Sequence, residues 1–299
     1  MCPQSQAVTC LSPARKIFSN WVMCWSASQA AFTRVELLAV LIMLTLLALM
    51  LLPALARTKS DSRGLRCLNN NRELNRAWRM WTDDNNDLLL FSSHNGIPSD
   101  PNNQRAWVIS ELDFSPSPKN WDPAVSITPS PMWPYCGTNA NIWRCPSDES
   151  YVLVNGSPKP RVRSFSMNFY LGGFAGSSGG APFSAYRLYL KSSEIIHPTP
   201  ERLFVFLDMR SDSINWGNFV TSMDGYPNNP AAFKFNDLPG AYHDGAATFT
   251  YADGHGEIHR WQDARTTPPL VLNGPINYDI PAPRNPDIAW LQDRATRPK

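Results

Sequence analysis

The chain has 299 residues, which is enough for one large or two small domains, and its formal net charge of +2 is close to neutral. A chain this close to neutrality lacks the basic footprint that nucleic-acid binding requires, so no nucleic-acid partner is expected. Its 27 prolines, 16 glycines and 11 tryptophans indicate a loop-rich globular part with aromatic residues for the core.

An uncharged apolar run, residues 37–56, lies near the N-terminus between Glu36 and Arg57. At about 1.5 Å per residue, a helix of this length measures about 30 Å, the thickness of the hydrocarbon part of a bilayer. We therefore expect a transmembrane helical segment at residues 32–56. The run is longer than the apolar core of a signal peptide, about 7–15 residues, although Ala54 to Ala56 has the small-x-small form of a cleavage site.

A carboxylate at the edge of such a run costs a few kcal/mol unless it finds a partner, so Glu36 is expected to have a role. The segment AFTRVE, residues 31–36, resembles the cleavage segment of the type IV pilin and type II secretion pseudopilin superfamily. The resemblance implies a leader peptide at residues 1–31, cleavage between Ala31 and Phe32 by a prepilin peptidase, and methylation of the new N-terminus. It also implies an assembly role for Glu36, opposite the α-amine of a neighbouring subunit, and a helix kink at Pro53.

The helical pattern continues in amphipathic form through residues 57–87, which we expect to be the outer half of the same helix. Its apolar stripe consists of Leu65, Leu68, Leu74, Trp78 and Trp81. The run of Asp and Asn residues at 83–87 is expected to end the helix.

Three cysteines follow the apolar run: Cys67, Cys136 and Cys145. If this part lies outside the cytoplasm, an odd number predicts one disulfide and one free thiol, and the sequence does not select the pair. The pilin-like resemblance implies a bond between Cys67 and Cys145, because related proteins have one cysteine just after the helix and another in a Cys-Pro-Ser-Asp segment. A bond from Cys136 to Cys145 across a short loop stays open.

Short β-type runs separated by turn residues predict an antiparallel sheet in a β-rich head, residues 88–262. The runs are residues 106–109, 163–171, 203–207, 246–252 and 257–261. Residues 263–299 are rich in proline and predict an extended tail. The predicted fold class is therefore α+β, with a long pilin-like helix, transmembrane in its first half, packed on an antiparallel sheet.

Nine residues separate His243 from Asp253-Gly254. This spacing is similar to a C-terminal signature, His-x9-Asp-Gly, of a group of pseudopilin-like proteins. Physically, Asp253-Gly254 predicts a two-residue type I′ hairpin turn. Alternation along the next strand places His255 and His259 on one face with acidic residues, which makes them weak metal-ligand candidates. Because an exposed hairpin face shows the same polar alternation, no metal and no cofactor is predicted.

These patterns predict a structural protein rather than an enzyme: a pseudopilin or minor pilin of a type II secretion or type IV pilus-like assembly. Its expected partners are prepilin peptidase, other pseudopilin subunits and inner-membrane lipid. The expected location is the bacterial inner membrane, as a single-pass protein with a cytoplasmic N-terminus and a periplasmic or extracytoplasmic head. Two alternatives stay open: a membrane-anchored or secreted binding module cut after Ala56, and a metal-dependent enzyme that uses the hairpin at residues 243–259.

Overall fold

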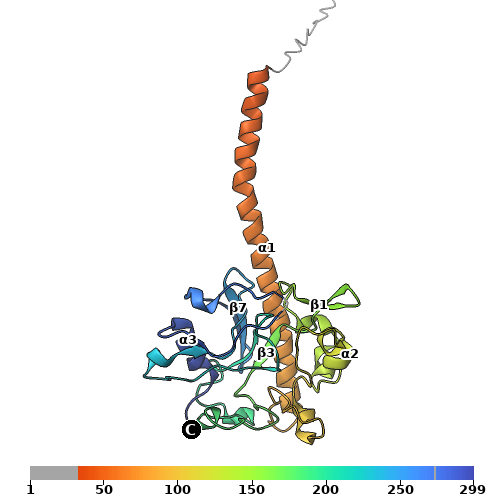
Figure 1. Cartoon of the computed structure of the whole chain (residues 1–299), viewed down its shortest axis with the longest axis vertical. Helices are drawn as coiled ribbons and strands as arrows, with labels where there is room; N and C mark the ends of the chain where they lie inside the picture. The colour runs from red at the N-terminus through yellow and green to blue at the C-terminus, as the bar shows by residue number, and fades with distance from the viewer. Residues whose placement is uncertain (1–32, 273) are drawn as a thin grey trace, which may run out of the picture. The chain divides into compact units, whose positions relative to one another are not determined.

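The computed structural model describes residues 33–272 and 274–299, with the backbone alone at residues 50–61. Its longest element is helix α1 (Arg34–Asp84), shown in Figure 1, and the chain divides into two compact units between Leu52 and Pro53. The expected cleavage site, Ala31 and Phe32, lies outside the described residues. Pro53 lies within α1 where only the backbone is described, and its predicted kink stays a prediction.

A capping box begins α1. The Thr33 hydroxyl accepts a hydrogen bond from the Glu36 amide at 3.2 Å, and Glu36 Oε2 accepts from the Thr33 amide and hydroxyl, both at 2.9 Å. This reciprocal pairing satisfies amide groups that have no partner within the helix. Glu36 therefore has a local structural role.

The predicted transmembrane first half of the helix is not borne out. Across residues 33–272 and 274–299, none of the helices combines the length and the apolar character that a membrane crossing requires. The side chains described before the backbone-only part end at Leu49, so they cover fewer than the about 20 residues of a span, and Arg34 and Glu36 carry charges at their start.

The second half of α1 packs on the sheet as the apolar stripe predicts for Leu68, Leu74, Trp78 and Trp81, which are all buried. The prediction for Leu65 is wrong, because this residue is exposed. The buried face runs through positions 64, 67, 68 and 71, and turns Leu65 away from the sheet.

Two buried asparagines on this face bond α1 to the strands. Asn75 Nδ2 donates to the carbonyl of Tyr251 at 2.8 Å, and Asn71 Nδ2 lies 3.2 Å from Thr248 Oγ1 and 3.3 Å from the Thr248 carbonyl. Figure 1 shows this part of α1 between the β7 side and the β1 side of the second unit. As predicted, the helix ends at the Asp-Asn run, where Asn86 and Asp87 take left-handed conformations.

A five-stranded sheet with the order β5-β3-β4-β7-β8 forms the centre of the second unit. Its strands are β3 (Phe165–Asn168), β4 (Phe204–Asp208), β5 (Asn218–Phe219), β7 (Ala246–Tyr251) and β8 (Gly256–Arg260). The runs predicted at residues 163–171, 203–207, 246–252 and 257–261 overlap four of these strands, whereas residues 106–109 form no strand. The sheet is mixed rather than antiparallel, because β5 pairs with β3 in parallel.

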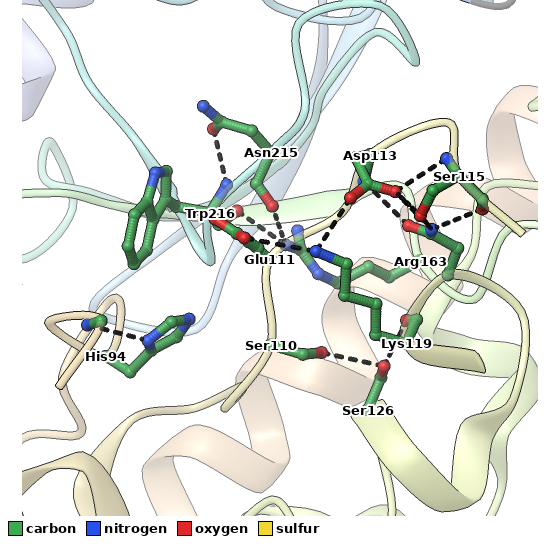
Figure 2. Close-up of polar contacts among 12 residues, drawn as sticks. His94, Ser110, Glu111, Asp113, Ser115, Lys119, Ser126, Arg163, Asn215 and Trp216 are labelled. Atoms are coloured by element: carbon green, nitrogen blue, oxygen red, sulfur yellow. Dashed lines mark hydrogen bonds and ion pairs between the residues drawn. The ribbon is translucent and has the colours of Figure 1, made fainter. Parts of the chain in front are cut away.

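Two buried arginines explain the parallel edge. Arg161 Nη1 donates to the Ser211 carbonyl at 2.6 Å, and Arg163 Nη2 donates to the carbonyls of Asn215 at 2.8 Å and Trp216 at 2.6 Å, as Figure 2 shows for Arg163. These bonds hold the connection after β4 so that the chain passes β3 and joins its far edge. The sequence shows no signal for so short an edge strand.

Smaller elements surround the sheet. Two further pairs of strands are antiparallel: β1 (Tyr151–Val154) with β2 (Ser157–Pro160), and β6 (Lys234–Phe235) with β9 (Ile280–Pro281). The short helices are η1 (Pro101–Arg105), η2 (Pro118–Asn120), α2 (Pro123–Ser126), η3 (Trp133–Cys136), η4 (Ala140–Trp143), η5 (Phe183–Ala185), η6 (Ser192–Glu194), η7 (Pro230–Ala232) and η8 (Ala264–Thr266).

The tail, predicted to be extended, contains helix α3 (Pro286–Ala295). The Asn285 side chain caps it by accepting from the amides of Asp287 and Ile288, and proline occupies the first helical position. Ile288, Leu291 and Ala295 are buried at helical spacing. The prediction of an extended tail is therefore wrong for residues 286–295, where Pro286 starts a helix.

Candidate metal centre

Four buried side chains with metal-ligating atoms converge in the second unit. They are Cys67, Cys145, Asp208 and His243, here called the buried cluster, and their donor atoms all lie within 4.8 Å of one another. Cys67 comes from α1 and Asp208 from the last position of β4. Cys145 follows η4, and His243 precedes β7. The buried cluster thus joins α1 to the sheet and to the Cys-Pro-Ser-Asp segment.

One nitrogen of His243 faces two members of the buried cluster. Nε2 lies 3.3 Å from Cys145 Sγ and 3.8 Å from Asp208 Oδ2. The other ring nitrogen, Nδ1, has no hydrogen-bond partner in the described part of the chain. In a nucleophile–histidine–acid triad, the nucleophile and the acid face opposite ring nitrogens. The arrangement here instead resembles a set of ligands around a common centre.

The two oxygens of Asp208 differ in their surroundings. Oδ1 accepts hydrogen bonds from the Thr248 hydroxyl at 2.7 Å and from the Thr248 amide. Oδ2 is buried and has no hydrogen-bond partner among the described residues. Thr248 therefore orients the carboxylate and leaves Oδ2 directed at the cluster.

The Cys-Pro-Ser-Asp segment folds as a turn around the Cys145 thiol. The Ser147 amide donates to Cys145 Sγ at 3.4 Å, and the Asp148 amide donates to the Cys145 carbonyl at 3.0 Å. Asp148 Oδ2 accepts from the Ser164 hydroxyl at 2.6 Å, and Ser164 Oγ accepts from the Cys145 amide at 3.1 Å. An amide that donates to sulfur favours the thiolate form, so this turn prepares Cys145 as a ligand.

The protonation equilibria of the buried cluster are shifted by burial and by its own members. Burial raises the pKa of Cys67 well above the ordinary thiol value, and burial raises the pKa of Asp208. Burial opposes ionisation of Cys145, but contacts with Cys67 and His243 lower its pKa overall. Burial also opposes protonation of His243, but the contact with Cys145 and the charge of Asp208 raise its pKa overall. The pKa of each of the four groups therefore depends on its neighbours in the buried cluster.

The His-x9-Asp-Gly motif contacts helix α1 at both of its ends. His243 belongs to the buried cluster, and at the other end of the motif the Asp253 carbonyl accepts a hydrogen bond from Arg79 of α1. A Cβ on Gly254 would lie 2.2 Å from Arg79 Nη1. Both ends of the motif thus contact α1.

The predicted two-residue turn is a three-residue loop. Tyr251 and His255 pair across it, with the Tyr251 amide donating to the His255 carbonyl at 3.0 Å. Of the loop residues, Gly254 has a positive φ of 100°, whereas a type I′ turn requires positive φ at both central residues. The extra residue brings Asp253 to Arg79.

The weak metal candidates lie apart from the buried cluster. His255 Nδ1 lies 2.7 Å from Asp253 Oδ1, and the His255 ring stacks on Tyr251. His259 stacks on Trp290 of α3 with the ring centroids 3.7 Å apart. Neither belongs to the group of potential metal ligands in the described part of the chain.

The structure brings Cys67 and Cys145 together, as the pilin-like resemblance implied, but as free thiols, while Cys136 lies outside the buried cluster. The disulfide between Cys67 and Cys145 stays a prediction.

Sequence reasoning missed Asp208 as a site residue. Its signal was an acid at the end of the apolar run of residues 203–207, where a buried strand gives it no access to water.

A second polar cluster lies between residues 110 and 126 (Figure 2). Lys119 Nζ lies 2.9 Å from Asp113 Oδ2 and 3.2 Å from Glu111 Oε1. Burial alone would raise the pKa of Asp113, but hydrogen bonds from Ser115 and Lys119 hold this pKa well below its usual range. Because these charges are paired with one another, this second cluster serves to fix the loop, and it offers no free ligand set.

Comparisons with models of protein families, with curated proteins and with solved structures find no match for this chain. The similarity of residues 31–36 and of residues 243–254 to pilin-like proteins therefore stays a prediction from the sequence. The chemistry of the buried cluster is argued from its geometry alone.

Proposed function

We propose that this protein is a structural subunit of a pilin-like assembly, in which the N-terminal segment of α1 packs against the same segment of neighbouring subunits. One observation carries the proposal: the large apolar side chains of residues 35–49 are exposed on every side of the helix. Val35 is 76 % exposed and Met43 is 62 % exposed. A helix that is apolar all round is ordinarily buried by other protein or by lipid.

The energetics support a partner for this segment. Burying one Val, Leu, Ile or Met side chain contributes about 1.5–3 kcal/mol, and soluble monomers rarely expose contiguous apolar patches above a few hundred Å². Helices of neighbouring copies offer matching apolar surfaces, since each copy carries the same residues. The segment is uncharged from Leu37 on, so such packing buries no unpaired ion there.

Glu36 fits this proposal as the charged end of the packing surface. If the chain is cut after Ala31, Phe32 gains an α-amine, which could pair with Glu36 of a neighbour. Pairing would offset the cost of burying either ion alone. The capping box accounts for Glu36 without any neighbour, so the test must separate the two roles.

The test is cysteine crosslinking in cells, with single cysteines placed along Leu37 to Leu49 in the full chain. We expect crosslinks between copies in the otherwise unaltered chain, and a reduced yield in Glu36→Leu. Glu36→Gln is the matched control, because glutamine preserves a capping box but removes the charge. A Gln variant that crosslinks as well as the parent would assign Glu36 to capping alone. Absence of crosslinks in the parent chain would contradict the proposal.

N-terminal sequencing tests the processing step separately. A mature chain that begins at Phe32 supports the action of a prepilin peptidase. A soluble mature chain that begins at Arg57 would lack the exposed apolar segment, and would favour the secreted binding module instead.

A further inference from the structure

The buried cluster carries an inference that is independent of assembly. We propose that it is a structural zinc site, in which Cys67, Cys145, Asp208 and His243 bind one Zn²⁺ and so fasten α1 to the sheet. Zinc in structural sites is held by four protein ligands drawn from Cys, His and Asp or Glu. The four donors come from four separate places in the chain, which is what a cross-linking metal requires.

The donor atoms lie close to the separations found around a tetrahedral ion. With Zn–S near 2.3 Å and Zn–N near 2.0–2.1 Å, tetrahedral ligand atoms lie about 3.4–3.8 Å from one another. Nε2 of His243 lies 3.3 Å from Cys145 Sγ and 3.8 Å from Asp208 Oδ2, and all four donor atoms lie within 4.8 Å. Small side-chain movements would complete the coordination.

An unpaired buried oxygen favours a cation at the centre of the buried cluster. Asp208 is fully buried, and its Oδ2 lacks a hydrogen-bond partner within the described residues. A buried polar atom without a partner costs a few kcal/mol, and a buried charge costs more. A divalent cation at the centre of the cluster would supply the partner that the protein does not.

The surroundings fit a metal site in two further respects. Thr248 bonds the Asp208 oxygen that does not face the cluster, and its hydroxyl lies 3.6 Å from Cys67 Sγ, as outer-shell groups that orient ligands do. A surface cavity of about 500 Å³ is lined partly by Asn70, Cys145 and Pro146, so it borders one of the four ligand residues.

The donor set selects the metal and the role. Two thiolates and an imidazole favour zinc over calcium or magnesium, which prefer oxygen ligands. On binding, every proton carried by the two thiols, the Asp208 carboxyl group or the coordinating nitrogen of His243 is released to water, and no bond to carbon is made or broken. Because all four positions are filled by protein and all four residues are buried, no position is left for a substrate, so the metal would stabilise the fold rather than catalyse.

The first experiment measures zinc in the purified full-length chain by plasma mass spectrometry, without added chelator. We expect about one zinc per chain, and loss of most of it in Cys67→Ser, Cys145→Ser and His243→Gln. Two matched controls should keep their zinc: Cys136→Ser removes a buried thiol outside the cluster, and His259→Gln removes a histidine outside it. Equal zinc in the cluster and control variants would overturn the proposal.

A second measurement uses the unmutated chain, so that misfolding of a variant cannot decide the outcome. The chain is stripped with a chelator and reloaded with Co²⁺, and its absorption spectrum is recorded. Thiolate-to-cobalt charge-transfer bands with intense tetrahedral d–d bands are expected, together with a higher thermal midpoint for the loaded protein. A folded chain with no zinc and no such spectrum, or one in which peptide mapping without reduction finds Cys67 bonded to Cys145, would overturn the assignment.

Discussion

The two described parts of α1 differ in what surrounds them. In residues 34–49 the large side chains are exposed, whereas in residues 64–84 one face is buried against strands and loops of the second unit. The first part is apolar on all sides, and the second has apolar and amide groups on one side and charges on the other. The same secondary structure therefore serves two purposes: the second part completes a core within its own unit, and the first part presents a surface that the described residues leave exposed.

Polar side chains on the second part of α1 bond it to the rest of the second unit. Asn71 and Asn75 bond to the strands, Arg79 bonds to the hairpin loop, and Cys67 joins the buried cluster. Such contacts fix both the register and the rotation of a helix. If the first parts of different copies pack together as proposed, residues 37–49 contribute no charged side chain to that packing, so many relative rotations would be similar in energy.

The largest expected effect is in the core of the second part. Trp78→Ala should lower the free energy of unfolding by about 3–5 kcal/mol, because it removes a fully packed side chain. Leu44→Ala, in the exposed first part, should leave the unfolding of the second unit unchanged. Urea unfolding followed by tryptophan fluorescence measures both. A comparable loss in the two variants would show that the two parts of α1 are not energetically separate.

A change of pH should affect the stability of the second unit and of the start of α1 in opposite directions. Burial raises the pKa of Asp237 to about 7, and its Oδ2 accepts from the Val220 amide at 2.7 Å. Because the folded pKa lies above the unfolded value of about 3.9, Asp237 binds a proton more readily when folded. Its contribution to stability is greatest below pH 4 and is lost as the pH rises to about 7.

Glu36 has the reverse sign. Hydrogen bonds from the Thr33 amide and hydroxyl lower its pKa, so its contribution to the helix start is present above the ordinary carboxyl pKa and is lost as the pH falls below it. The measurement is urea unfolding of the second unit and hydrogen exchange at the start of α1 between pH 3 and pH 8. Asp237→Asn should remove up to about 4 kcal/mol of the pH dependence of unfolding, at 1.36 kcal/mol per pKa unit. If Asp237→Asn and the parent chain show the same pH dependence of unfolding, Asp237 is not its cause.

The contact between the hairpin loop and α1 should have a smaller effect. Gly254→Ala should destabilise by about 2–3 kcal/mol, since φ is 100° and the added Cβ would meet Arg79. Gly180→Ala is a close control, because its φ is 97° and nothing lies within 4 Å of the added Cβ, so we expect about 1 kcal/mol. Thermal unfolding compares the two. If Arg79→Ala leaves the cost of Gly254→Ala unchanged, the steric part of the explanation is wrong.

Much of the second part of α1 could be predicted from the sequence, because the spacing of Leu74, Trp78 and Trp81 reports a buried helical face directly. The parallel edge strand could not be predicted, since it depends on Arg163 bonding to carbonyls some fifty residues away. Three of the four members of the buried cluster could be singled out from the sequence, because Cys67, Cys145 and His243 each stand in a recognisable motif. That the motifs meet, and that Asp208 joins them, depends on strand order rather than on local pattern.

The smallest effect decides what Glu36 does. Thr33→Ala removes the hydroxyl that caps the Glu36 amide but leaves the carboxylate in place, so the helix start should lose about 1 kcal/mol, as other N-cap replacements do. Hydrogen exchange at residues 34–37 should report this local fraying. If Glu36 pairs with a neighbour's α-amine, crosslinking along residues 37–49 should persist in Thr33→Ala and fall in Glu36→Gln, because the former keeps the charge and the latter keeps the cap. If capping is its whole role, Thr33→Ala should reduce crosslinking at least as much as Glu36→Gln does, since a frayed helix start would then be the common cause.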